Sequence, residues 1–242
     1  MGRDVTPEVE FIIELYRQMH GREPDSLLDL ACGPGYHARR FAQCGKRAVG
    51  LDFNPAMIDM AQEKAAADGV AVEWLVGDMR SVELAQPVDM AVNVFDGIDC
   101  LTSNDDLITH LQSIAANLTP GGLYLIDVTN PIETSISHYA PFRYHAERDG
   151  IDVDVQWGVN DPYVDPLTHV AHTRMRMTIN DHGEHIVIED EADERVLTAQ
   201  EIILLARLSG GLHPVCWYGA YDLNQPFNRE SPRMIAVLQK MG

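Results

Sequence analysis

The sequence predicts an α/β fold: a mostly parallel sheet of seven strands with an antiparallel edge hairpin, and a small antiparallel β insertion after the fifth strand. Three observations lead to this prediction. Strand-like apolar runs alternate with helix-like segments from residue 27 to residue 128, and repeated βα units build a parallel sheet covered on both faces. The first strand ends in a tight glycine turn, Gly33-Pro34-Gly35. Near residue 130 the helical segments give way to extended ones.

The first element expected is a helix over residues 8–19. Its apolar side chains recur at helical spacing, and Thr6-Pro7 is a start signal. Beyond it, the alternation predicts strands at 27–31, 47–51, 71–76, 88–94 and 123–128, helices at 36–44, 55–68 and 104–118, and a short helix or loop near 80–85. Pro55 fits the first turn of the helix at 55–68.

The second half of the chain contains the insertion. Segments 142–157, 168–179 and 184–190 look extended, and Asn180-Asp181-His182-Gly183 is a good hairpin turn. The apolar residues between 170 and 179 do not alternate strictly, so the direction in which they face stays open. A helix at 198–209, with Thr198 as its cap, and strands at 213–221 and 233–239 close the chain. We expect two regions: 1–130 with 196–242, and an inserted antiparallel region at 131–195 that covers a pocket.

Composition narrows the possible partners. The 242 residues carry a net charge of −19, which repels phosphate backbones and anionic membranes, so neither nucleic acid nor a membrane is expected as a partner. The four cysteines have no CxxC spacing, and the sequence shows no leader and no apolar run of membrane-spanning length. A cytoplasmic protein with reduced cysteines is expected. The ten histidines are scattered without a convincing third ligand, so no metal is expected.

Three further motifs accompany the glycine turn. Asp29 precedes the glycines within the strand, Val76-Gly77-Asp78-Met79 follows another strand-like run, and Leu118-Thr119-Pro120-Gly121-Gly122 leads into Leu123 to Asp127. This set, in this order, resembles the class I S-adenosylmethionine-dependent methyltransferases over residues 27–128. The resemblance implies a Rossmann-like sheet, S-adenosyl-L-methionine as cofactor and S-adenosyl-L-homocysteine as product.

The resemblance also implies roles for residues at the strand ends. Asp29 would bind the ammonium of the cofactor's amino-acid tail, and the glycine turn would let the backbone approach tail and ribose. An acid at the end of the second strand can accept from both ribose hydroxyls, which is the role expected of Asp52. The full cofactor set is Asp29, Ala31, Gly33, Gly35, Asp52, Phe53, Met57, Gly77, Asp78, Met79, Asn93 and Phe95. Two alternatives stay open: Asp29 as a satisfied buried carboxylate and Asp78 as a turn residue.

The acceptor site is expected near the ends of the fourth and fifth strands. His138 is the preferred general base, and Asp96 could hold a cationic amine. The expected substrate-binding set is Tyr16, Phe95, Asp99, Asn130, Tyr144, Trp157 and Arg174. Capping for Asp99, a core position for Trp157 and a solvated strand face for Arg174 are the alternatives.

The expected function is methyl transfer to a small-molecule acceptor by in-line displacement, helped by proximity and a possible general base. Nitrogen is slightly favoured over oxygen because of the acids near the pocket, and the motifs also resemble sugar amine N-methyltransferases. Two alternatives remain. A regulatory protein could bind the cofactor without catalysis. A nicotinamide-dependent oxidoreductase would need a catalytic pair such as Tyr-x-x-x-Lys, which the chain lacks. A homodimer is possible.

Overall fold

The computed structural model describes residues 4–131 and 141–241, and the chain divides into two compact units. The first, the seven-stranded unit, comprises residues 1–98, 104–129 and 199–242. The second, the four-stranded unit, comprises residues 99–103 and 130–198. The short segment 99–103 thus belongs to the same unit as the insertion, although it is separated from it in the sequence.

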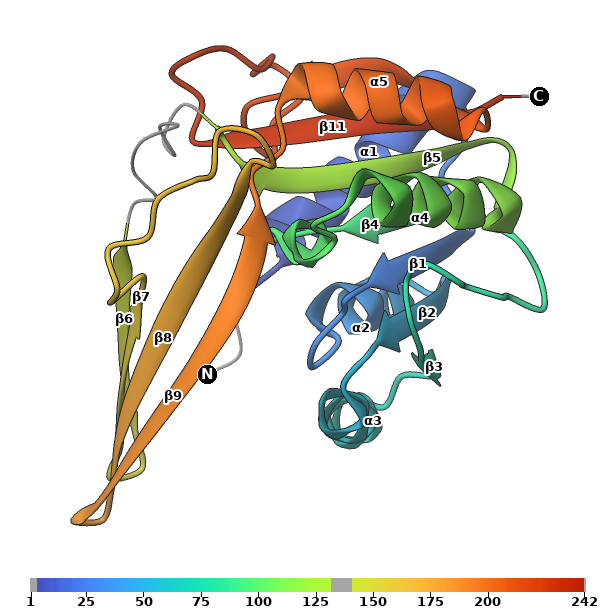
Figure 1. Ribbon diagram of the computed structural model, residues 1–242. Helices are drawn as coiled ribbons and strands as arrows, with labels where there is room; N and C mark the ends of the chain where they lie inside the picture. The colour runs from blue at the N-terminus through green and yellow to red at the C-terminus, as the bar shows by residue number, and fades with distance from the viewer. Residues whose placement is uncertain (1–3, 132–140, 242) are drawn as a thin grey trace. The chain divides into compact units, whose positions relative to one another are not determined.

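The seven-stranded unit confirms the predicted fold class. Its strand order is β10-β11-β5-β4-β1-β2-β3, parallel from β5 to β3 and antiparallel at β11 and β10. Helices α4 and α5 lie against one face of the sheet and α1 against the other (Figure 1). The strands are β1 (Ser26–Leu30), β2 (Arg47–Asp52), β3 (Glu73–Val76), β4 (Val88–Asn93), β5 (Leu118–Thr129), β10 (Leu212–Tyr218) and β11 (Arg233–Lys240).

Helix ends follow local signals in the sequence. The helices are α1 (Thr6–His20), α2 (Tyr36–Gln43), α3 (Pro55–Asp68), α4 (Asn104–Asn117) and α5 (Ala199–Ser209). Helix α3 begins as predicted at Pro55, because the Asn54 side chain accepts from the backbone N–H of Ala56. It ends at Gly69, whose φ of 69° is a left-handed conformation that glycine adopts without strain.

Two elements differ from the prediction. Strand β5 begins at Leu118 rather than 123, because the Thr119–Gly122 segment continues along β4 through an irregularity in the pairing. A 3₁₀ helix, Gly97–Cys100, follows β4 where none was predicted. Residues 80–85 form a loop, one of the two forms predicted for them.

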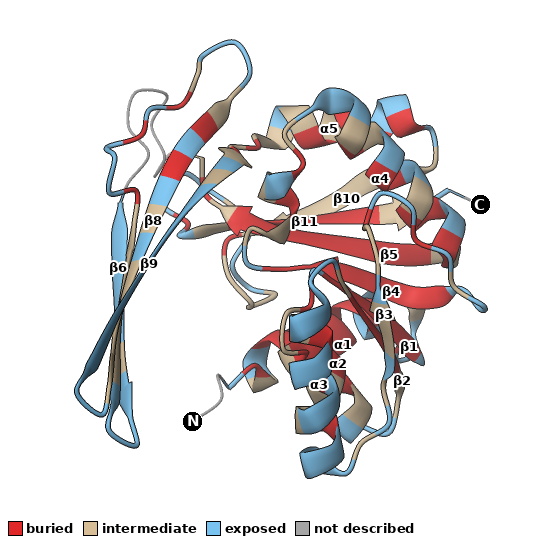
Figure 2. Ribbon diagram, turned by 60° about the horizontal axis from the view of Figure 1, so that its bottom comes forward, coloured by how far each residue is buried: buried red, intermediate tan, exposed pale blue. Residues whose placement is uncertain are grey.

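The core of the seven-stranded unit lies along its central strands. Every residue of β1 and β4 is buried (Figure 2), which is typical of parallel strands covered on both faces. Helices α1 and α2 contribute Ile12, Leu15 and Phe41 to the core cluster. Among the described helices, none is long and apolar enough to cross a membrane.

The four-stranded unit is an antiparallel sheet. Its strands, in sheet order, are β6 (Phe142–Arg148), β7 (Ile151–Trp157), β8 (Val170–Asp181) and β9 (Glu184–Arg195). The predicted hairpin turn joins β8 and β9, with positive φ at His182 and Gly183. The register settles which way β8 faces: its odd-numbered residues from Thr173 to Ile179 share one side of the sheet.

Candidate functional site

Hydrogen bonds join the glycine turn to the neighbouring strand β2 at the carboxyl edge of the parallel sheet. The backbone N–H of Gly33 donates to Asp52 Oδ2 at 2.8 Å, and that of Cys32 donates to the carbonyl of Leu51 at 3.0 Å. The other Asp52 oxygen accepts from the backbone N–H of Asn54 at 2.9 Å. A carboxylate has about four lone-pair sites, so Asp52 keeps acceptor capacity for hydroxyl groups.

Asp29 lies beneath this turn with half of its carboxylate unsatisfied. Its Oδ2 accepts from the backbone N–H of Ala38 at 3.1 Å, whereas Oδ1 has no hydrogen-bond partner among residues 4–131 and 141–241. Burial raises the pKa of Asp29 to about 7, against the lowering effect of the Ala38 N–H. A buried acceptor without a partner is costly, so this oxygen marks a place where a cationic donor is expected.

Asn93 supplies a second buried oxygen of the same kind. The register places Asn93 of β4 beside Leu30 of β1, three residues before Gly33. Its amide nitrogen donates to Met79 Sδ at 3.5 Å, and its Oδ1 has no hydrogen-bond partner in the described part of the chain. A Cβ at Gly97 would lie 2.9 Å from this oxygen and 3.1 Å from the Cβ of Ala31, so the 3₁₀ helix packs directly on the turn.

The second glycine of the motif makes room for a protein side chain. A Cβ at Gly35 would lie 2.2 Å from the indole of Trp74, and a Cβ at Gly50 would lie 2.3 Å from the same ring. Trp74 therefore fills a slot between α2 and β2. The backbone φ of 71° at Gly35 independently favours glycine.

A buried histidine that the sequence analysis did not single out, His110, forms a hydrogen bond with the backbone of Met79. The ring of His110 in α4 contacts the carbonyl of Met79 through Nδ1 at 2.8 Å and the hydroxyl of Tyr124 through Nε2 at 2.7 Å. Because a carbonyl only accepts, Nδ1 carries the proton. Burial lowers the pKa of His110 to about 4, so it is neutral at physiological pH and serves to position Met79.

At the ends of β4 and β5, Arg233 joins two carboxylates. It donates to Asp127 Oδ1 and to Asp96 Oδ2, each at 2.8 Å. Asp96 Oδ1 accepts from the backbone N–H of Thr129, and Asp127 Oδ2 accepts from Tyr221 at 2.8 Å and from the Phe95 N–H at 3.2 Å. Burial and Asp127 raise the pKa of Tyr221.

This cluster holds a strained turn. Phe95 and Asp96 both have positive φ, 57° and 63°, and the Arg233 guanidinium lies 5.6 Å from the centroid of the Phe95 ring. Non-glycine residues in this region persist when their surroundings hold them there. Arg233 and Tyr221 escaped the sequence analysis because they lie more than ninety residues from their partners in the chain.

Most of the cofactor residues expected from the sequence lie at the carboxyl edge of the seven-stranded unit. Gly77 follows β3, and its N–H donates to the Asp52 carbonyl at 3.0 Å. Phe53 is 78% exposed just after β2, and Met57 is half-buried in α3. Asp78 differs from its expected state: Arg80 donates to both of its oxygens, and these hydrogen bonds lower the pKa of Asp78. Its role in cofactor binding stays a prediction.

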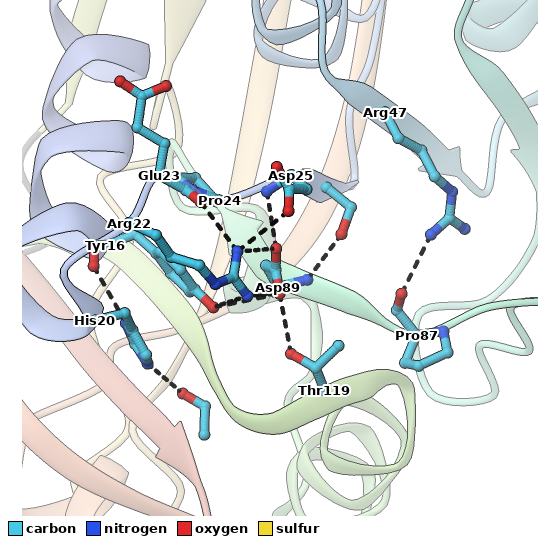
Figure 3. A network of polar contacts seen from close by, with 12 residues as sticks. Tyr16, His20, Arg22, Glu23, Pro24, Asp25, Arg47, Pro87, Asp89 and Thr119 are labelled. Carbon is cyan, nitrogen blue, oxygen red and sulfur yellow. Dashed lines mark hydrogen bonds and ion pairs between the residues drawn. The ribbon is translucent and has the colours of Figure 1, made fainter.

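The structure places Tyr16, expected to bind substrate, at the opposite edge of the sheet from the glycine turn, and its substrate role stays a prediction. Figure 3 shows Tyr16 in a network around Asp89, the second residue of β4 and therefore at the amino edge of the parallel sheet. Its hydroxyl donates to Asp89 Oδ1 at 3.2 Å, and only 2% of the residue is exposed. Burial, followed by Asp89, raises the pKa of Tyr16 to about 12. Ligands bind at the carboxyl ends of such strands, so Tyr16 is a core residue.

Arg174, also expected to bind substrate, is paired within its own sheet, and its substrate role stays a prediction. It lies on the opposite side of the four-stranded sheet from Tyr144 and Trp157, and it donates to Glu191 at 2.6 and 3.0 Å. Asp99 and Asn130 belong to the four-stranded unit, where Asn130 is buried. The catalytic candidate His138 lies outside the described residues.

Within the described ranges, no group of three histidine, cysteine or acidic side chains is placed to hold a metal ion. The four cysteines are free, and burial raises the pKa of Cys32 beside the turn.

Comparison with known proteins agrees with this geometry. A methyltransferase-domain family model matches residues 27–122. A cypemycin N-terminal methyltransferase from Streptomyces sp is 30% identical over 232 residues, covering 94% of this chain and 87% of that protein. A dTDP-4-amino-2,3,4,6-tetradeoxy-D-glucose N,N-dimethyltransferase from Saccharopolyspora spinosa is 31% identical over 126 residues, 52% of this chain. That match spans about half of the relative, 49% of its length.

The fold has a close counterpart among solved structures. An S-adenosylmethionine-dependent methyltransferase from Clostridium acetobutylicum ATCC 824 superposes with a TM-score of 0.83 at 18% identity, covering 99% of this chain and 93% of that one. At such low identity the likeness shows the fold alone.

A glycine turn after β1, an acid at the end of β2 and an antiparallel β11 together define an enzyme of the Rossmann-like class with a nucleoside-containing cofactor. The chain belongs to the class I S-adenosylmethionine-dependent methyltransferases. The site fits this cofactor, because the two unpartnered buried oxygens of Asp29 and Asn93 suit the ammonium of a methionine tail. The nicotinamide-dependent alternative is dropped.

Proposed function

We propose that this chain methylates an amine nitrogen of a small organic acceptor. The observation that carries the proposal is the state of the two carboxylates at the ends of β4 and β5. Both oxygens of Asp96 and of Asp127 already accept hydrogen bonds from protein donors. Each of these carboxylates accepts three hydrogen bonds, so only about one of its four lone-pair sites is left for a substrate proton, whereas Asp52 has about two. A hydroxyl acceptor needs its proton removed, whereas a neutral amine attacks with its own lone pair.

Two relatives support the same choice, although a malonyl-[acyl-carrier protein] O-methyltransferase also matches part of the chain. The relative that covers nearly the whole chain is named an N-terminal methyltransferase, and the amino-sugar relative is named an N,N-dimethyltransferase. The sequence argument for nitrogen rested on acids that would hold a cationic amine. Arg233 offsets one of their two charges, so the support now comes from how few acceptor sites these two carboxylates leave for a substrate proton.

In this proposal, residues of the seven-stranded unit hold the cofactor. Asp29 and Asn93 would accept from the ammonium, and Asp52 would accept from the ribose hydroxyls while it keeps the Gly33 turn in place. The cofactor supplies an electrophilic methyl group on a sulfonium. The main task left to the protein is to hold the acceptor nitrogen in line with that methyl, an effect that can contribute about 7–11 kcal/mol.

Asp96 is proposed as a positioning residue instead of a catalytic one. Its carboxylate ties the Phe95–Asp96 turn to Thr129 and Arg233, so it fixes the backbone at the end of β4. His138 remains the proposed base for any acceptor that needs one.

The test is a matched pair of acceptors. The enzyme is incubated with S-adenosylmethionine and either dTDP-4-amino-2,3,4,6-tetradeoxy-D-glucose or the same sugar with a hydroxyl at position 4. A second pair is a peptide with a free amino terminus and its acetylated form. Mass spectrometry follows the methylated product and S-adenosylhomocysteine. We expect product only from the amine members, and faster reaction as pH rises through the pKa of the acceptor amine.

Calorimetry separates the possible failures. S-adenosylmethionine and S-adenosylhomocysteine are expected to bind, and NAD and NADP are not. Cofactor binding together with faster methylation of a hydroxyl member would refute the choice of nitrogen. Binding without turnover of any acceptor, including chemically varied amines, would favour a regulatory protein.

A further inference from the structure

One face of helix α4 holds the segment that leads from β3 to β4. Residues 79–84 of this segment form neither helix nor strand. Four polar side chains of α4, three or four residues apart, each make a hydrogen bond to it: Asp106 to Arg80, His110 to Met79, Ser113 to Val82 and Asn117 to Leu84. Residues at this spacing lie on one face of a helix. The path of the segment is therefore set by α4.

His110 holds the end of this segment that lies nearest to the carboxyl edge of the sheet. Its Nδ1 donates to the Met79 carbonyl at 2.8 Å, and its Nε2 accepts from the Tyr124 hydroxyl at 2.7 Å. His110 and Tyr124 are both fully buried. Because burial lowers the pKa of His110 to about 4, the neutral ring keeps this one donor and this one acceptor at physiological pH.

Met79 in turn fixes the orientation of a buried amide. Its sulfur accepts from Asn93 Nδ2 at 3.5 Å, and a thioether sulfur cannot donate. Turning the amide over would bring Oδ1 against the sulfur, which places two acceptors together. Oδ1 therefore faces away from Met79, where it has no hydrogen-bond partner among residues 4–131 and 141–241.

The orientation of this amide decides which ligand group it can bind. An ammonium only donates, so it is bound by an amide oxygen and repelled by an amide N–H. Asp29 Oδ1, on the neighbouring strand β1, is the other buried oxygen assigned to the ammonium. We propose that His110 is a positioning residue for the amino group of the cofactor, acting through Met79 to hold Asn93 Oδ1 as an acceptor. This inference rests on the proposed binding of the ammonium by Asp29 and Asn93.

Two substitutions of His110 separate its two hydrogen bonds. The side-chain amide of asparagine is short enough to replace Nδ1 and donate to Met79, whereas that of glutamine extends to the position of Nε2 and to Tyr124. The ligands are S-adenosylhomocysteine and its des-amino analogue, in which hydrogen replaces the amino group. Calorimetry at pH 8, where Asp29 is mostly ionised, measures the affinity of each variant for both ligands.

We expect wild type and His110→Asn to prefer S-adenosylhomocysteine over the analogue to the same extent. In His110→Gln this preference should fall about tenfold, the lower end of the effect of one hydrogen bond to a charged group. Met79→Leu removes the sulfur at nearly constant volume, so it should lower the preference in the same way while His110 stays in place.

Ser113→Ala is the matched control on the same face of α4. It removes the acceptor of the Val82 N–H, three residues further along the segment. Urea denaturation should therefore show a lower midpoint for this variant, as for His110→Gln, while its preference for S-adenosylhomocysteine stays that of wild type.

Equal preference in His110→Gln and wild type would overturn the proposal. An equal loss in His110→Asn and His110→Gln would also overturn it, because the effect would then not depend on the hydrogen bond to Met79. If His110→Gln does not fold, an unchanged preference in Met79→Leu overturns it instead. A wild type that binds both ligands equally would refute the ammonium assignment and this proposal with it. All of these are binding measurements, so failure to methylate an amine would count against the proposed function alone.

Discussion

Two buried carboxylates in neighbouring strands of the same sheet have opposite surroundings. Asp89, at the amino end of β4, accepts from two guanidinium nitrogens of Arg22 at 3.0 and 2.9 Å and from the Asp25 N–H at 2.8 Å. Asp29, near the carboxyl end of β1, accepts only from Ala38, and one of its oxygens has no hydrogen-bond partner in the described ranges.

The pKa values of the two carboxylates shift in opposite directions, as their hydrogen-bond partners lead one to expect. Burial acts to raise the pKa of Asp89, but Arg22 and the Asp25 N–H outweigh it and hold the pKa below its ordinary value. Burial prevails at Asp29, whose pKa rises to about 7. A carboxylate whose charge the protein satisfies serves stability. One that the protein leaves unsatisfied weakens the fold and is available to a ligand.

The largest effect is expected at Asp89. Replacing it with alanine leaves Arg22 and Tyr16 without their acceptor. We expect Asp89→Ala to lower the free energy of unfolding by about 2–3 kcal/mol, because the Tyr16 hydroxyl loses its acceptor in the core while Arg22, whose side chain is half exposed, can turn to water. Urea denaturation measures this change. Calorimetry on the folded variant should give an unchanged affinity for S-adenosylmethionine, and a weakened affinity would show that the two edges are not independent.

Asp29→Asn should weaken cofactor binding without destabilising the fold, the reverse of what is expected for Asp89→Ala. We expect S-adenosylmethionine to bind about 10- to 100-fold more weakly, because a hydrogen bond to a charged group contributes about 1.5–3 kcal/mol. Without cofactor, the variant should melt above wild type at pH 8 and lose that advantage at pH 5. The reason is that a raised folded pKa costs stability only once pH exceeds the unfolded value, and the cost is complete above the folded value. Equal cofactor affinity in the two proteins would remove Asp29 from the site.

The pH dependence of cofactor binding gives a smaller effect. A cationic ligand favours ionised Asp29, so affinity should be constant above pH 8 and about tenfold lower at pH 6, one unit below a pKa of about 7. Calorimetry at several pH values, in buffers of differing ionisation enthalpy, also counts the proton released. Asp29→Asn should be insensitive to pH over this range, and a parallel decline in the variant would assign the titration to another group.

Tyr16→Phe should have the smallest effect. It removes one hydrogen bond to Asp89, which other donors still satisfy, so the free energy of unfolding should fall by about 0.5–1.5 kcal/mol. The KM for the acceptor should not change. An increase in that KM without a stability loss would place Tyr16 in the substrate site.

Local signals account for what the sequence predicted well. Helix α3 has its own start at Asn54-Pro55 and its own stop at Gly69, so its bounds followed from neighbouring residues. The βα alternation placed the strand ends, and with them Asp29, Asp52 and Asn93, at one edge of the sheet.

Long-range pairing accounts for what was missed. Arg233 lies 137 residues from Asp96, and Tyr16 lies 73 residues from Asp89, so neither partner is visible in a local pattern. The facing of β8 was unclear from its own residues, because Val170 interrupts the apolar alternation. The pairing of Met175 and Met177 with Trp157 and Val155 resolves it.

The slot occupied by Trp74 bears on how this protein can evolve. The indole of Trp74 fills a space that side chains at positions 35 and 50 would otherwise enter. Glycine at both positions leaves that space to the indole. Gly50→Ala should therefore be harmful alone and tolerated beside Trp74→Leu, since Gly50 has no positive φ to preserve. A lineage that loses the indole becomes free to gain a methyl group at 50, whereas the glycine at 35 stays constrained by its backbone. One glycine of the motif that signals cofactor binding is thus required twice, by its backbone conformation and by the neighbouring tryptophan.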